Sequence, residues 1–269
     1  MLIASDAVDQ GQAQMSAPAR QLRLFAPDAI SEISPGENLV QAVLDGITAA
    51  GEELQDGDIV VLAQKIVSKA ERRLVRLGEV SPGAEASALA DETGKDPRLI
   101  ELILRESSEI VRKREGLIIA RHRNGCVVAN AAIDLSNAGE TETAVLLPAD
   151  ADISAREFAE CVSAATGKQI AVVINDSMGR AWRLGTSGTA IGAYGLAALQ
   201  NRRGAVDREG NVLQSTEIAI ADEVAAAASL LMGQGNEGLP AVVIRGLDWV
   251  SGSGNAADLV RPRETDLFR

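Results

Sequence analysis

The chain has 269 residues, the size of one large domain or two modest ones. With 26 Lys and Arg against 38 Asp and Glu, its formal net charge is −12. Such an acidic chain is a poor nonspecific partner for nucleic acid or an anionic membrane, both of which need a basic face, and its six aromatic residues argue against stacking on single-stranded bases.

The first 20 residues give no sign of a helix or strand. Residues 1–20 are polar, rich in Ala and Gln and without a hydrophobic period, which is typical of a disordered leader. They lack a basic region followed by an apolar stretch, so we expect no signal peptide, and no apolar run reaches the ~18–20 residues of a membrane helix. We therefore expect a cytoplasmic protein. Gln21–Phe25 alternates and predicts a first strand.

The first helix and the first buried strand follow. Ser34 and Glu37 form a capping box before a series of apolar residues at helical spacing, which predicts an amphipathic helix ending near Gly51. The turn at 56–58 precedes Ile59–Ala63, an apolar run of strand length.

The middle of the chain is predicted to carry charged helices and then short strands, with an Asn-Gly pair at 124–125 that is typical of a hairpin turn. In chain order we expect helices at 85–93 and 97–106, and strands at 109–113, 117–121, 126–128 and 143–147.

The last third begins with a second capping box. Ser154 and Glu157 predict a helix that stops at Gly167, and Ile170–Ile174 follows as a buried strand. The segment Gly185–Leu199 is interrupted by glycines and is predicted to end in an apolar helix. The remaining expected elements are a long helix at about 216–232, a strand at 241–245 and a polar tail at 251–269.

The strands come in clusters rather than in strict alternation with helices. This favours an α+β fold over a doubly wound sheet. We place one module at residues 21–250, with a weakly marked subdomain boundary near 149–154.

A single histidine and two cysteines restrict the metal chemistry. A zinc site needs about four nitrogen or sulfur ligands, which His122, Cys126 and Cys161 cannot supply. A bound metal must therefore have mostly oxygen ligands, which is typical of Mg or Mn. The same count excludes a disulfide scaffold. No neighbouring Ser or Cys motif supports His122 as a general base, and the two cysteines are more typical of core positions than of nucleophiles.

Two acidic segments of similar design carry the main chemical signal. Asn130–Asn137 follows the strand that ends near Val128, and Asn175–Arg180 follows the buried strand before it. A carboxylate just past a strand end, flanked by amide and hydroxyl oxygens, can hold Mg while leaving positions for water and phosphate. Two such loops together would clamp a polyphosphate through two metal ions. The same residue types also cap turns, so either loop alone is ambiguous, and the pair favours function.

Basic and glycine-rich segments give weaker signals. Lys65 and Lys69 follow the first buried strand, and a lysine can neutralise a transferring phosphate, although taken alone they are typical of a solvated edge. No GxxxxGK[ST] motif occurs. Met232–Gly238 follows the long helix, where glycines let backbone amides approach an anion, and where a helix C-cap with a flexible linker fits equally well.

Five ordered blocks of the sequence carry a family resemblance. They are 57–61 continuing to 66–71, then 130–137, 174–180, 221–223 with 232–233, and 238–246. In this order and at compatible spacing, across roughly residues 21–250, they resemble the coenzyme F420-0:L-glutamate ligase family.

The resemblance implies a fold, a reaction and partners. The fold is a family-specific α+β glutamate-ligase fold of mixed, largely antiparallel sheets with flanking helices, in an intertwined homodimer. The reaction is GTP-dependent addition of L-glutamate, and of successive γ-linked glutamates, to the deazaflavin coenzyme F420-0, with Mg or Mn and usually potassium. Amide formation needs an activated carboxylate, and phosphoryl transfer from GTP would supply an acyl phosphate.

The resemblance also implies the roles of individual residues. By matched position, Asp134 and Asp176 resemble ligands of the divalent metal, Ser177 and Gln234 resemble ligands of a second ion, and Lys69 joins the two aspartates as a catalytic residue. The implied nucleotide contacts are Ile30, Ser31, Glu32, Ile33, Gln64, Lys65, Lys69, Asn137, Leu230, Leu231, Met232, Gly233, Gln234, Gly235, Asn236 and Glu237.

Two other functions are compatible with the sequence. One is a non-catalytic protein that binds the deazaflavin or a nucleotide, which would bind without consuming GTP. The other is an NTP-dependent amide ligase for a different acid substrate. Only a screen of acceptors distinguishes it from the F420-0 ligase.

Overall fold

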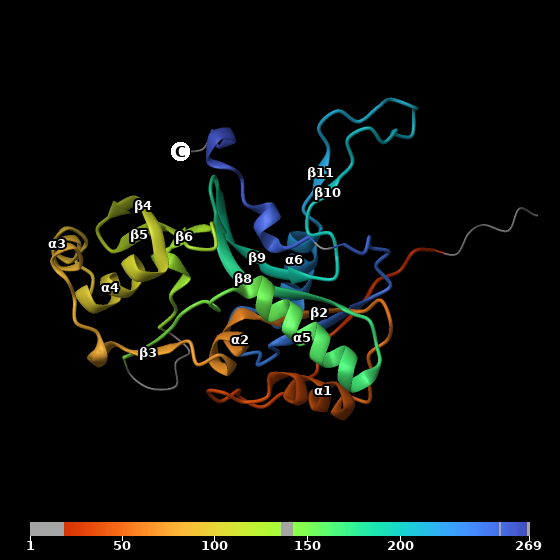
Figure 1. Ribbon diagram of the computed structural model, residues 1–269, viewed down its shortest axis with the longest axis horizontal. Coiled ribbons are helices and arrows are strands. Elements are labelled where there is room, and N and C mark those ends of the chain that lie inside the picture. Colours follow the sequence, from red (N-terminus) through yellow and green to blue (C-terminus); the bar gives the residue numbers. More distant parts are fainter. Residues whose placement is uncertain (1–18, 136–141, 253, 268–269) are drawn as a thin grey trace, which may run out of the picture.

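The computed structural model describes residues 19–135, 142–252 and 254–267. Its main lobe is built on a five-stranded sheet with the order β1-β12-β2-β8-β9 (Figure 1). The central pair β2 and β8 is parallel, and the other three pairings in this sheet are antiparallel. The strands are β1 (Arg23–Phe25), β2 (Ile59–Ala63), β8 (Ala171–Arg180), β9 (Arg183–Tyr194) and β12 (Ala241–Arg245).

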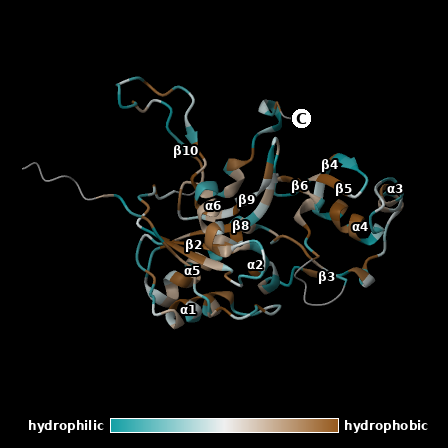
Figure 2. Ribbon diagram, turned by 180° about the vertical axis from the view of Figure 1, so that it is seen from behind, coloured by the Kyte–Doolittle hydropathy of each residue, from teal (hydrophilic) through white to brown (hydrophobic). Residues whose placement is uncertain are grey.

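Helices cover both faces of this sheet, which explains the unbroken apolar sequence of its central strands. Val60 of β2 belongs to the core shared with α1 (Leu39–Ala49) and α5 (Ala151–Thr166). Val61, the next residue, belongs to the core on the opposite face, which α6 (Ile220–Met232) covers. Figure 2 shows the hydrophobic residues gathered at the centre of the molecule.

Strand β9 passes between two helices at glycine positions. A Cβ atom at Gly192 would collide with the backbone of Ala151 in α5, and one at Gly188 would collide with the backbone of Ala225 in α6. The predicted apolar helix at the end of Gly185–Leu199 is therefore wrong, because these glycines allow close packing of helices on a strand.

Helices α1 and α5 begin at residues other than the predicted capping residues. Asn38 caps α1 by accepting a hydrogen bond from the Gln41 backbone N–H (3.2 Å), whereas Ser34 and Glu37 form a turn before the helix. Asp150 caps α5, so the second capping box is wrong, and Ser154 lies inside the helix.

The end of α5 agrees with the prediction, and the start of α6 does not. Gly167 ends α5 in the left-handed conformation, as expected. Helix α6 starts at Ile220 rather than near 216, because Glu217–Ile218 forms β11 and pairs with β10 (Gln200–Asn201). Cys161 is exposed on α5, so its expected core position is wrong.

A second lobe, residues 74–135 and 142–146, has its own core of buried aliphatic residues beside the main sheet (Figure 1). Its helices and its three-stranded antiparallel sheet β4-β5-β6 confirm the elements expected there. The elements are β3 (Leu74–Arg76), the 3₁₀ helix η1 (Leu77–Glu79), α3 (Ala84–Thr93), α4 (Pro97–Glu106), β4 (Ser107–Arg114), β5 (Leu117–His122), β6 (Val127–Ala129), the 3₁₀ helix η2 (Asn130–Ala132) and β7 (Thr143–Val145).

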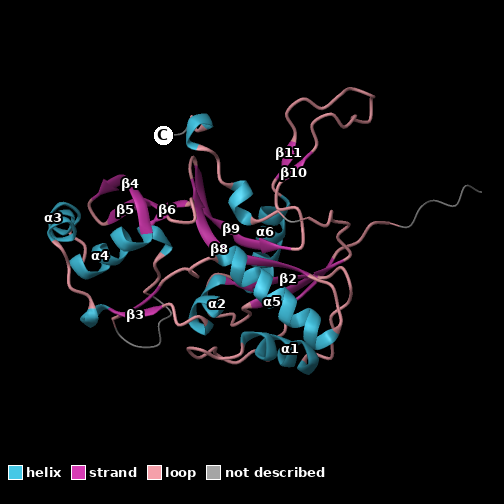
Figure 3. Cartoon of the chain, in the orientation of Figure 1, coloured by secondary structure: helices cyan, strands magenta, loops and turns pink. Residues whose placement is uncertain are grey.

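Two further segments complete the described chain. The connection between β10 and β11 extends away from both lobes (Figure 3). The expected polar tail contains the 3₁₀ helices η3 (Ala256–Leu259) and η4 (Arg263–Thr265), and Ala256 is buried in the core on the α6 side.

The mixed α+β fold with largely antiparallel sheets is confirmed. The intertwined homodimer stays a prediction. The expected leader lies outside the described residues apart from 19–20. In the described part of the chain, no helix is both long and apolar enough to cross a bilayer.

One buried ion pair joins Asp58, directly before β2, to Arg245 at the end of the antiparallel strand β12. Asp58, only 1% exposed, accepts hydrogen bonds from Arg245 Nε (2.8 Å) and Nη2 (2.7 Å). Replacing Arg245 with Met leaves the carboxylate buried and unpaired, so we expect the free energy of unfolding to fall by about 3 kcal/mol in urea denaturation. Arg203→Met is the control: its ion pair with Glu217 is exposed, and we expect a loss below about 1 kcal/mol. Equal losses in the two variants would contradict this prediction.

Candidate active site

A cavity of about 830 Å³ opens beside the carboxyl end of β2. Ala63, the last residue of β2, pairs with Asn175 of β8, so the segment that follows β2 lies next to the part of β8 that carries Asp176. Helix α2 (Gln64–Ala70) starts directly after β2. The predicted site residues that line this cavity are Ile30, Ser31, Glu32, Ile33, Gln64, Lys65, Lys69, Asp134, Asp176, Ser177, Met232, Gly233, Gln234, Gly235 and Asn236.

Four predicted site residues are not part of this lining as described. Leu230 is 84% exposed on α6, and Leu231 packs against the core under that helix. The Glu237 side chain turns back to accept a hydrogen bond from the Gly235 backbone N–H (2.8 Å). Asn137 lies outside the described residues.

Asp176 lies within a strand, so the prediction of a loop at Asn175–Arg180 is wrong. Strand β8 continues through this segment because it pairs with β9 as far as Arg180. Side chains alternate between the two faces of a strand, which puts Asp176 on the face of Ile174 and Met178. Asn175 lies on the opposite face, next to α6.

The second aspartate comes from the second lobe by way of a constrained turn. Asn130, Ala131 and Ala132 have φ angles of 51°, 53° and 57°, a left-handed conformation that costs L-residues roughly 1 kcal/mol each. Asp134 follows, and its backbone pairs with Val145 in both directions (3.1 and 2.8 Å). The turn and this pairing direct the Asp134 side chain into the cavity.

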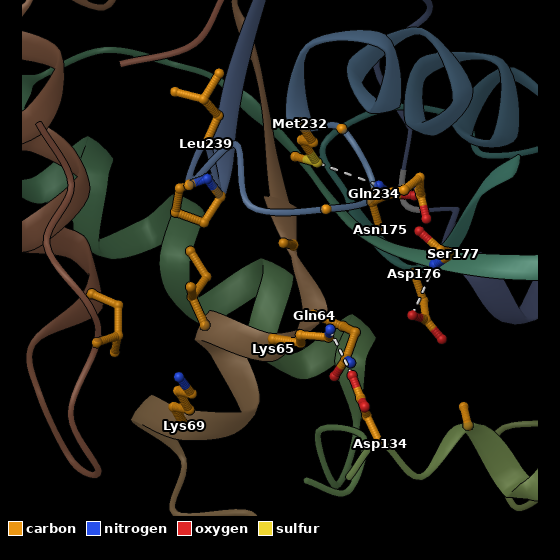
Figure 4. Close-up of a pocket in the computed structure, with 18 of the residues that line it drawn as sticks. Gln64, Lys65, Lys69, Asp134, Asn175, Asp176, Ser177, Met232, Gln234 and Leu239 are labelled. Carbon is orange, nitrogen blue, oxygen red and sulfur yellow. Dashed lines mark hydrogen bonds and ion pairs between the residues drawn. The ribbon is translucent and has the colours of Figure 1, made fainter. Parts of the chain in front are cut away.

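The two aspartates, 42 positions apart in the sequence, converge in the folded protein (Figure 4). Burial raises the pKa of Asp176 above its usual range; the Ser177 backbone N–H and Lys65 oppose this shift, and the charge of Asp134 adds to it. A partly buried carboxylate that has lost water and lies near a second carboxylate is an environment that favours binding of a cation.

The donor atoms at this point fit a hard metal ion. The two carboxylates, the Ser177 hydroxyl and the Gln234 side-chain amide all line the cavity with oxygen atoms. Mg and Mn favour oxygen ligands, and Mg is held by one or two carboxylates together with substrate phosphates. Among the described residues no third His, Cys, Asp or Glu side chain joins the two aspartates.

Both lysines of α2 enter the cavity rather than a solvated edge. Lys65 Nζ lies 2.6 Å from Asp134 Oδ2, and Lys69 Nζ lies 2.9 Å from Glu32 Oε1. Hydrogen bonding to Lys69, helped by its charge, lowers the pKa of Glu32. The Lys69 side chain is only 13% exposed. The two ammonium groups therefore place positive charge at two separate points of one cavity.

Asn175 is a site residue that the sequence interpretation did not assign a role. It is buried, its Nδ2 donates to Ser229 Oγ (3.1 Å) and Met232 Sδ (3.4 Å), and its Oδ1 accepts from the Thr189 backbone N–H (3.0 Å). It thereby holds the end of α6, from which the glycine-rich loop enters the cavity. The only available signal was an amide residue directly after a buried strand.

Comparison with known proteins places the chain in a family. The family model described as F420-0:Gamma-glutamyl ligase matches residues 29–246. The chain belongs to this ligase family. Named relatives support the assignment: "Coenzyme F420:L-glutamate ligase" of Methanothermobacter thermautotrophicus is 44% identical over 92% of this chain and 99% of its own length. The proteins of the same name from Methanocaldococcus jannaschii and Methanopyrus kandleri are 42% and 41% identical, covering 80% and 88% of this chain and 86% and 94% of their own lengths.

A buried polar cluster in this family member anchors the second lobe, which carries Asp134. Glu106, at the end of α4, accepts a hydrogen bond from Arg73 Nη2 (2.6 Å), and Arg73 Nε donates to the Leu147 carbonyl (2.8 Å). His122 is buried, with Nε2 3.6 Å from Glu106 Oε2, while its Nδ1 accepts from the Asn124 N–H (3.1 Å). Burial also raises the pKa of the Cys126 thiol to about 11, so it is not a ready nucleophile.

This cluster predicts an acid-sensitive contribution to stability. Burial acts to raise the pKa of Glu106, but His122 and the charge of Arg73 outweigh it and lower the pKa. A carboxyl with a lowered pKa stabilises the fold above its unfolded pKa of ~4.3 and loses that contribution as the pH falls through the folded value. We expect Glu106→Gln to lower the free energy of unfolding by about 1–2 kcal/mol at pH 7, with the deficit shrinking below about pH 4.

The control for this measurement is Glu160→Gln, because Glu160 and its partner Arg156 are both exposed on α5. Urea denaturation at several pH values should give a change below about 0.5 kcal/mol for this variant. A deficit of Glu106→Gln that stayed constant down to pH 3 would contradict the assigned role of the Glu106 charge.

Proposed function

We propose that this chain is a GTP-dependent ligase that adds L-glutamate, and then further γ-linked glutamates, to the deazaflavin coenzyme F420-0. Membership of the ligase family and the names of its relatives support the acceptor and the amino acid. The observation that carries the proposal is the convergence of Asp134 and Asp176 in one cavity, lined also by Lys65 and Lys69. Two carboxylates and two ammonium groups are suited to a polyphosphate held through a divalent ion.

The proposed reaction has two steps. A carboxylate oxygen of the acceptor attacks the γ-phosphorus of GTP, the bond from that phosphorus to the β–γ bridging oxygen breaks, and GDP leaves, forming an acyl phosphate. The amino group of L-glutamate then attacks the acyl carbon, loses a proton and expels inorganic phosphate. An amide bond remains, and the hydrolysis of one GTP is coupled to its formation.

The residues of the cavity supply binding and charge for these steps. Asp134 and Asp176 would hold Mg or Mn, and Ser177 and Gln234 would hold a second ion such as potassium. A divalent ion supplies positive charge beside the β- and γ-phosphates. Lys69, one turn further along the same face of α2 as Lys65, would neutralise the transferring phosphoryl group, and the backbone N–H groups of the loop Met232–Asn236 would contact the nucleotide. The homodimer is part of the same proposal.

The test is a direct assay for the product. Purified protein is incubated with F420-0, GTP, Mg or Mn, and L-glutamate, with and without potassium, and mass spectrometry should detect F420-0 with added glutamate together with stoichiometric GDP and phosphate. Absence of a glutamyl product overturns the proposal. In that case calorimetric binding without GTP consumption identifies a binding protein, and GTP consumption with another acid identifies a ligase for that acceptor.

A pair of variants tests the two-aspartate site. Asp176→Asn keeps the size of the side chain but removes the charge that would hold the ion, so we expect turnover to fall by at least ~10³-fold while the thermal midpoint is retained. Asp91→Asn, on the exposed face of α3, should leave turnover unchanged. Full activity of Asp176→Asn at low metal concentration would show that the site is wrongly placed.

A further inference from the structure

The two lysines of α2 are not equivalent, although they lie one helical turn apart. Lys69 pairs with Glu32, which is exposed at the rim of the cavity. Lys65 pairs with Asp134, one of the two converging aspartates, at 2.6 Å (Figure 4). The charge of Lys65 also reaches Asp176. Lys65 is therefore the positive charge that the protein itself places at the aspartate pair.

An ammonium group and a divalent cation make incompatible demands on one carboxylate at this position. A cation bound between Asp134 and Asp176 would lie close to an ammonium held 2.6 Å from the Asp134 oxygen, and the two positive charges would repel each other. Binding of the ion therefore requires Lys65 to leave Asp134 or to weaken that pair.

We propose that Lys65 is an internal competitor for the divalent cation: its ion pair with Asp134 weakens metal binding until another anion takes the ammonium. The inference rests on the metal site of the proposed function. Lys65 lines the same cavity as the loop Met232–Asn236. A phosphate bound there offers the ammonium a second partner, so metal and nucleotide favour each other's binding beyond their direct contact.

The experiment measures binding of Mn²⁺ without nucleotide, by the electron paramagnetic resonance signal of the unbound ion, and needs no turnover. Lys65→Met keeps the apolar stem and removes the charge, and we expect it to bind Mn²⁺ about tenfold more tightly than the unmodified protein. Lys65→Arg keeps a positive charge at this position and should bind it as weakly as the unmodified protein does.

Lys69→Met is the matched control, because it removes the same charge from the same helix at a carboxylate that is not part of the aspartate pair. We expect its Mn²⁺ affinity to change less than about threefold, the size of a general charge effect. Equal tightening in Lys65→Met and Lys69→Met, or no tightening in Lys65→Met, overturns the competition. Thermal midpoints of all variants confirm that they are folded.

A further arm tests the coupling with nucleotide. At saturating GDP the affinity for Mn²⁺ should rise several-fold more in the unmodified protein than in Lys65→Met, because only the former has an internal competitor to displace. The same increase in both proteins contradicts the coupling.

Asp134→Asn separates this inference from the proposed function. If Asp134→Asn binds Mn²⁺ as the unmodified protein does, the proposed metal site itself is wrong. If that variant loses the ion and Lys65→Met behaves as the unmodified protein, the metal site stands and the competition alone is wrong.

Discussion

The parallel pairing of β2 with β8 is the constraint on which the site depends. It puts the carboxyl end of β2, followed directly by α2, next to the middle of β8, more than a hundred residues away in the sequence. The lysines of α2 and Asp176 of β8 are therefore brought together beside the end of β2. Since α6 and the helices of the opposite face bury both strands, neither can shift along the other without moving every core side chain to the wrong face.

The cavity contains positive charge although the chain as a whole is negatively charged. The chain carries a formal net charge of −12, which opposes the approach of a polyanion, yet the cavity contains two lysines beside its two aspartates. Lys65 is paired with Asp134 and Lys69 with Glu32, so with Asp176 the cavity holds three carboxylates against two ammonium groups, and small changes at one partner affect the other. A site of this kind responds to a ligand of either sign.

Much of the fold could be predicted because its signals are local. Continuous apolar runs identified β2, the first half of β8 and β12, and the Asn-Gly pair marked the turn before β6. The two aspartates could be paired because each follows a predicted strand. Whether a polar segment continues as a strand depends on a neighbouring strand that can pair with it. The sequence of Asn175–Arg180 alone indicates a loop, and the pairing with β9 makes it part of β8.

The remaining differences have the same origin in tertiary structure. The glycines of β9 have no local signature that separates a helix interface from a flexible segment, since the two helices that approach them are distant in sequence. Asn175 likewise bridges two elements, donating to Ser229 of α6 and accepting from Thr189 of β9, and both partners are distant from it in the sequence. Cap choice depended on single hydrogen bonds, with Asp150 in place of Ser154.

The left-handed backbone at Asn130–Ala132 limits which sequences can keep this site. Branched side chains such as Val or Ile cannot adopt that conformation without a large steric penalty, so they are barred from three consecutive positions by the main chain alone. Divergence in this stretch is thus confined to small or amide residues, and Ala132 also lines the cavity. A change there would act at a distance, by letting the peptide relax and carrying the following carboxylate out of the cavity.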